Sequence, residues 1–208
     1  MSEPSQTTVV AFHEAGHVVV AHLLGDRVEG ATIRPGRHYR GVASHTELAV
    51  VDYAPAAEAV GQPLPLQPGD LRRWVEVHAT IAMAGDEAGL LALTDPPRHA
   101  TPEGPAPVLQ PVPERVRRRW ECASDDIPLS DHEVALDACW LVCADWHTRT
   151  ALMALCTAVA RDLVRANAAT IGRVARALLE HGELSGPDLI TLIEEGDANA
   201  DPVQAQSA

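Results

Sequence analysis

Residues 9–21 read VVAFHEAGHVVVA, a nearly all-apolar stretch interrupted by two histidines and one glutamate. On an α-helix, side chains four positions apart point the same way, so His13 and His17 are expected to present their rings on one face. Two imidazoles at this spacing suit a single tetrahedral Zn²⁺, and Glu14 then lies beside the metal as a general base for a water molecule. The HExxH pattern therefore predicts a zinc hydrolase site, with His13 and His17 as metal ligands and Glu14 as the catalytic residue.

The apolar flanks of the motif favour this interpretation. A helix that is apolar on all sides is buried, and buried histidines and glutamates rarely occur without partners. The alternative is a chance string on a core helix, since short motifs of this kind also arise in unrelated chains. Ser5 or Thr7 is expected to cap the helix at its start, and Gly25 to end it.

Length and charge limit the possible functions. The 208 residues are enough for one well-buried domain, or for one domain with an appended helical lobe. They contain no GxxxxGK[ST] phosphate loop, so we expect no ATPase in this chain. A net charge of −13 argues against a nucleic-acid partner and against an anionic membrane surface. The N-terminus resembles no signal peptide, no apolar run approaches the ~18 residues of a membrane span, and four cysteines suit a reducing compartment. A cytoplasmic protein is expected.

Turn and cap signals divide the rest of the chain into elements. Strands are expected at 28–33 and within 39–49, and a helix at about 71–93 with Asp70 as its cap. Residues 94–114 are rich in proline and are expected to form a long loop. Further helices are expected at about 130–143, 148–167, 169–181 and 187–194.

Ser130 and Glu133 have the spacing of a capping box for the first of these later helices. Residues 196–208 are polar and are expected to be a disordered tail. The pattern as a whole indicates an α+β fold that is mostly α-helical. It consists of the HExxH helix, a small β-sheet and a C-terminal helical lobe.

A catalytic zinc has three protein ligands and one open position, so a third donor must come from elsewhere in the chain. The extended HExxHxxGxxH form needs glycine and histidine where Val20 and Leu23 stand, which excludes that class of protease. His22 points away from the face that carries His13 and His17. A carboxylate from a later helix is the best remaining option.

Several segments, in order along the chain, resemble the peptidase domain of the FtsH family of ATP-dependent zinc metalloproteases. They are HEAGH with its flanks at 10–21, the strand and turn at 31–36, Gly41-Val42, IAMAG at 81–85, CASDDI at 122–127 and the helical residues 175–186. The resemblance implies a zincin-like fold in a single peptidase-like domain over residues 1–195. The motor and the membrane anchor of the family have no counterpart here, so the chain looks like a stand-alone peptidase-domain relative.

In that family an aspartate at the start of a helix completes the zinc site, and two residues compete for this role here. Asp126 matches the family's local string, whereas Asp131 matches the helix register, with Ala135 four residues further on. Pro128 disfavours a helix that begins before it, which favours Asp131. Only one of the two aspartates is expected to bind the metal, and the alternative for either is a carboxylate that merely stabilises a helix N-terminus.

The resemblance implies a zinc-dependent peptidase that hydrolyses peptide bonds without an ATPase of its own. Its substrate is expected to be a peptide or a flexible protein segment, which a partner protein or a separate ATPase could deliver. The same resemblance makes Gly41 and Val42 part of an edge strand to which a peptide substrate adds. The alternative is a catalytically inactive, peptidase-like interaction or regulatory module.

Overall fold

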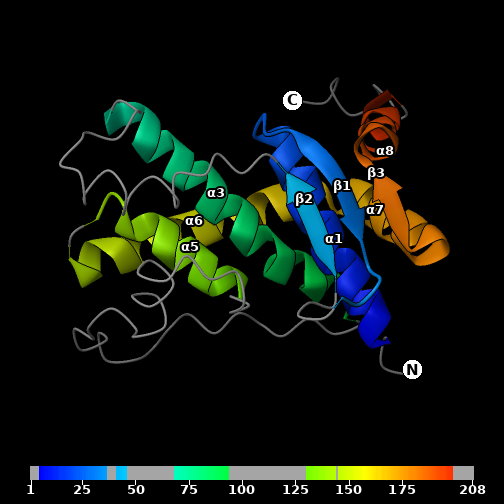
Figure 1. Cartoon of the computed structure of the whole chain (residues 1–208), viewed down its shortest axis with the longest axis horizontal. Coiled ribbons are helices and arrows are strands. Elements are labelled where there is room, and N and C mark those ends of the chain that lie inside the picture. Colours follow the sequence, from blue (N-terminus) through cyan, green and yellow to red (C-terminus); the bar gives the residue numbers. More distant parts are fainter. Residues whose placement is uncertain (1–4, 37–40, 46–67, 94–129, 144, 199–208) are drawn as a thin grey trace, which may run out of the picture. The chain divides into compact units, whose positions relative to one another are not determined.

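The computed structural model describes residues 5–36, 41–45, 68–93, 130–143 and 145–198. They form an α+β fold that is mostly helical and contains a three-stranded antiparallel sheet, which confirms the predicted class (Figure 1). The elements are α1 (Gln6–Leu23), β1 (Val28–Thr32), β2 (Val42–His45), α3 (Pro68–Gly89), the 3-10 helix η1 (Leu90–Ala92), α5 (Asp131–Trp140), α6 (Trp146–Ala166), α7 (Ala168–His181), β3 (Glu183–Ser185) and α8 (Gly186–Ala198).

The chain divides into two compact units. The first consists of Met1–Thr46, Ala84–Thr94 and Arg161–Ala208, and the second of Glu47–Met83 and Asp95–Ala160. Helices α3 and α6 each contribute residues to both units. No helix within the described ranges combines the length and the apolar character that a bilayer crossing requires.

Helix α1 is the central element of the first unit. The side chain of Ser5 caps it by accepting a hydrogen bond from the backbone N–H of Thr8, and Gly25 follows its end with a φ of 80°. Both signals had been predicted. The helix packs against α7, β1, β2 and α8, and Val19 and Val20 are fully buried. Because valine is a weak helix former, this burial rather than intrinsic propensity stabilises the helix.

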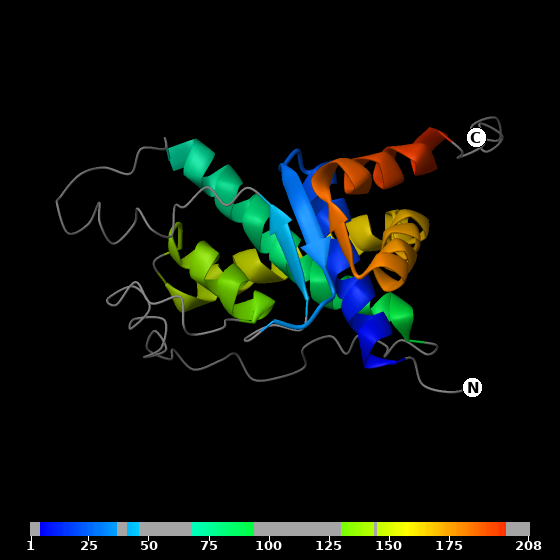
Figure 2. The same cartoon turned by 45° about the vertical axis from the view of Figure 1, so that its right-hand side comes forward.

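The sheet has the strand order β2-β1-β3, with both pairs antiparallel. Figures 1 and 2 show β1 and β2 lying along α1, and β3 beside α7 and α8. Strands β1 and β2 fall where strands were predicted. Strand β3 was missed because three residues, Glu183–Ser185, are too short to give an alternating pattern.

Helix boundaries differ from the prediction in several places. Helix α3 begins at Pro68, so Asp70 lies inside the first turn and is not the N-cap; proline is well tolerated there because the first helical N–H groups lack helical acceptors. Helix α5 ends at Trp140, before the predicted end at 143, and α8 extends past 194 to Ala198. The predicted loop at 94–114 lies outside the described residues.

Hydrogen bonds between small side chains connect the described helices of the second unit. Cys139 of α5 and Cys156 of α6 are buried and their thiols are hydrogen-bonded to each other. The thiol of Cys156 also hydrogen-bonds Thr80 of α3. At the start of α5, the Glu133 carboxylate accepts a hydrogen bond from the backbone N–H of Ser130, which is one arm of the predicted capping box.

Candidate metal centre

The two histidines of α1 face each other. Nε2 of His13 lies 3.1 Å from Nε2 of His17, and the two rings are nearly perpendicular. Two nitrogens bound to one tetrahedral zinc at about 2.0–2.1 Å are about 3.3 Å apart, so this spacing suits a shared metal ion. The His17 residue is buried, whereas the side chain of His13 is 25% exposed. The helical spacing thus brings the rings together as the sequence predicted.

Glu14, which follows His13 in the sequence, is buried and lies close to the backbone of Gly41. It is only 5% exposed. A Cβ atom placed on Gly41 would lie 2.5 Å from Oε1 of Glu14, so the absence of a side chain there lets the backbone pass beside this carboxylate. The next residue, Val42, begins β2 and pairs with Thr32 of β1. Gly41, one of the two predicted substrate residues, is therefore adjacent to the predicted general base.

Near its C-terminal end, at Gly85, helix α3 packs against the rings of both histidines. A Cβ atom on Gly85 would lie 2.4 Å from Nε2 of His17 and 2.8 Å from Cε1 of His13. Only glycine allows this helix backbone to lie so close to both rings. One residue on, Oδ1 of Asp86 lies 3.7 Å from Nδ1 of His13.

The glycine inside the motif has a packing role. A Cβ atom on Gly16 would lie 2.4 Å from Cβ of Ala88 and 2.6 Å from the carbonyl oxygen of Ala84. Helices α1 and α3 therefore make close contact at Gly16. Gly85 was predicted only as part of the resemblance, and Asp86 was not predicted. The run of small residues at 84, 85, 88 and 89 was the available signal for a close helix contact.

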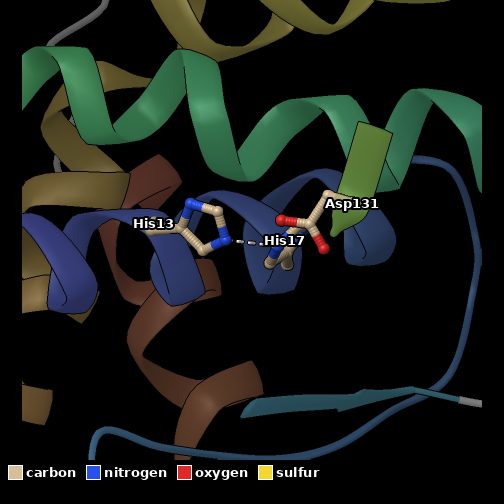
Figure 3. A group of neighbouring side chains, drawn as sticks. All are labelled: His13, His17 and Asp131. Carbon is tan, nitrogen blue, oxygen red and sulfur yellow. Dashed lines mark hydrogen bonds between the residues drawn. The ribbon is translucent and has the colours of Figure 1, made fainter. Parts of the chain in front are cut away.

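Of the two candidate aspartates, Asp126 lies outside the described residues. Asp131 is the first residue of α5. Asp131, His13 and His17 have side chains of the kinds that hold a metal ion, and Figure 3 draws the three. Asp131 belongs to the second unit and the histidines to the first, so a complete three-ligand site is part of the proposal below.

No family model matches this chain, and no curated protein matches it either. The likeness to the FtsH peptidase domain therefore stays a prediction from the sequence.

Proposed function

We propose that this protein is a zinc-dependent peptidase, with His13, His17 and Asp131 as metal ligands and Glu14 as general base. The observation that carries the proposal is the 3.1 Å separation of the two Nε2 atoms on a helix that also buries Glu14. Two imidazoles that face each other at this distance, with a glutamate beside the first, are the donor and base arrangement of HExxH zinc sites. The predicted likeness to the FtsH peptidase domain supports the same activity.

The donor set supports zinc as the metal. Two imidazoles and one carboxylate hold the ion in many catalytic zinc sites and leave one position open. Asp131 is preferred to Asp126 as the third ligand because it is the first residue of α5, the helix position that the predicted resemblance requires. A divalent ion such as Fe²⁺ also accepts this donor set, so the metal has to be identified by analysis of the purified protein.

Each protein group then has a defined role in peptide hydrolysis. Zinc, when bound, polarises the scissile carbonyl and lowers the pKa of water. Glu14 accepts the proton of the attacking water molecule and passes it to the amine that leaves. His13 and His17 would hold the ion through their Nε2 atoms, on the helix that also carries Glu14.

Strand β2 offers a place for the substrate. It pairs with β1 on one side, and within the described sheet it is an edge strand. An extended peptide that adds to this edge would run past Gly41 and so past the Glu14 carboxylate. We therefore propose peptides and flexible protein segments as substrates, since only an unfolded segment can add as a strand. We propose that a partner protein or a separate ATPase delivers substrates that are less flexible.

The proposal is tested with the full chain loaded with zinc. We expect about one zinc per chain by elemental analysis, and cleavage of an unstructured, casein-like protein. Glu14→Gln should retain the zinc and lower cleavage at least about 100-fold, because it removes the proton acceptor and leaves the ligands in place. Glu180→Gln, at an exposed position of α7, is the matched control and should cleave normally.

Two results would contradict the proposal. Undiminished cleavage by Glu14→Gln would rule out the assigned general base. A zinc-loaded protein that cleaves no flexible substrate would exclude a peptidase and leave the non-catalytic interaction module. The third ligand is assigned by comparing Asp131→Asn with Asp126→Asn. We expect only the first to weaken zinc binding, and the reverse result would assign the role to Asp126.

A further inference from the structure

The imidazole of His13 has a different neighbour at each of its two nitrogens. Its Nε2 faces Nε2 of His17 at 3.1 Å, and its Nδ1 faces Oδ1 of Asp86 at 3.7 Å. Both neighbours lie in the same compact unit as His13. One nitrogen therefore points to the proposed metal position, and the other points to a carboxylate.

This arrangement bears on where the ring carries its proton. A neutral imidazole has one N–H and one lone pair, and a ring that binds a metal through Nε2 must carry its proton on Nδ1. A carboxylate beside Nδ1 favours that tautomer, because it accepts the N–H and increases the basicity of the other nitrogen. In many metal sites such a carboxylate also fixes the orientation of the ring.

We propose that Asp86 is a positioning residue that holds His13 in its metal-binding tautomer and orientation. This inference rests on the proposed metal site. A separation of 3.7 Å is longer than a hydrogen bond, so without metal the contact is electrostatic. If His13 holds a metal ion through Nε2, its proton would be on Nδ1, where the Asp86 carboxylate would accept it.

The backbone next to Asp86 distinguishes this contact from an ordinary surface ion pair. Exposed pairs contribute little by themselves, and the Asp86 side chain is 59% exposed. However, the preceding residue is Gly85, whose Cα lies against the rings of both His13 and His17. The α3 backbone therefore places residue 86 next to His13.

The experiment compares Asp86→Asn with the wild-type chain and with a matched control. Asp162→Asn removes the same charge from an exposed position of α6 in the same compact unit. Zinc affinity is measured by competition with a chromophoric chelator. We expect Asp86→Asn to lower it about 10–100-fold, and Asp162→Asn to leave it within about twofold. Asp86→Glu should recover part of the loss, because it restores a carboxylate.

A second measurement reports the tautomer directly. In ¹⁵N-histidine-labelled, zinc-loaded protein, His13 should show a slowly exchanging Nδ1–H resonance, and Asp86→Asn should shift it or abolish it. The thermal midpoint of the metal-free protein should stay the same, which separates positioning from a structural role. Wild-type zinc affinity together with an unchanged His13 resonance in Asp86→Asn would overturn the positioning role of Asp86 and leave the proposed metal site intact. A wild-type chain that binds no zinc would overturn the metal site itself, whereas zinc binding without cleavage would contradict only the peptidase activity.

Discussion

Gly85 and His17 are so close that a side chain on the first would collide with the second: a Cβ atom on Gly85 would lie 2.4 Å from Nε2 of His17. The clash is with the nitrogen proposed to bind the metal. Helix α3 therefore determines the space available to the rings on α1. A tightly packed interior has little freedom to absorb an additional methyl group.

The first prediction concerns Gly85→Ala. The methyl group should displace the imidazole of His17, lower zinc affinity at least about tenfold, and destabilise the fold by about 1–3 kcal/mol. Gly89→Ala in the same helix is the control, because its Cβ atom would be 3.6 Å from the nearest atom, which is ordinary contact. Chelator competition and thermal unfolding measure both effects. Wild-type zinc affinity in Gly85→Ala would show that the contact does not constrain the site.

The second prediction separates the general base from the metal ligands. A methyl group on Gly41 would lie 2.5 Å from Oε1 of Glu14, so Gly41→Ala should displace this carboxylate while leaving His13 and His17 in place. We expect the cleavage rate to fall about 10–100-fold with zinc content unchanged. Gly69→Ala, where a Cβ atom would meet nothing within 4 Å, should behave like the wild type. Loss of zinc in Gly41→Ala would contradict this separation of roles.

The third prediction concerns an ion pair near the end of α3. The guanidinium of Arg161 donates hydrogen bonds to both carboxylate oxygens of Glu87, which is only 9% exposed. Arg161→Ala would leave a buried carboxylate without this guanidinium. We expect a loss of about 2–3 kcal/mol in the free energy of unfolding, somewhat less than for fully buried pairs because the Arg161 side chain is 29% exposed. Arg165→Ala, at an exposed position of the same helix, should change it by less than about 0.5 kcal/mol in urea titrations. A similar small effect for both variants would show that the pair is not important for stability.

The fourth prediction concerns the thiols of the second unit. A hydrogen bond to Cys156, together with burial, raises the pKa of the Cys139 thiol. A raised pKa means that Cys139 stays protonated near pH 8, and the thiol form is not the nucleophile. Iodoacetamide should therefore label Cys139 at least about 100-fold more slowly in the native protein than in urea, as followed by peptide mass spectrometry. Equal labelling rates in the two conditions would contradict the hydrogen-bonded, buried arrangement.

The parts of the site that could be predicted are those fixed by local geometry. The i, i+4 spacing of His13 and His17 on a helix depends only on the helical repeat, and the cap at Ser5 depends on neighbouring residues. The sequence therefore predicted α1 and the facing rings correctly. The capping signal at Ser130 and Glu133 likewise located the start of α5.

The parts that were missed depend on contacts between distant segments. The small residues around Gly85 are typical of a close helix contact, but no local pattern identifies the rings of His13 and His17 as its partners, because that contact follows from how α3 packs on α1. Strand β3 exists because β1 offers it a partner, and its three residues carry no periodic signal. Asp70 suggested a cap, but Pro68 already allowed the helix to begin earlier.

The pairing of β1 with β3 has a consequence for the order of folding during synthesis. Thr32 donates a hydrogen bond to the carbonyl of Gly182, which lies 150 residues later in the chain. During synthesis, one edge of β1 therefore stays unpaired until Ser185, the last residue of β3, has emerged from the ribosome. Long-range strand pairing of this kind is slow, and an open edge can associate with other chains in the meantime. Truncations before Ser185 should accordingly accumulate as aggregates in cells even though they retain the whole HEAGH helix.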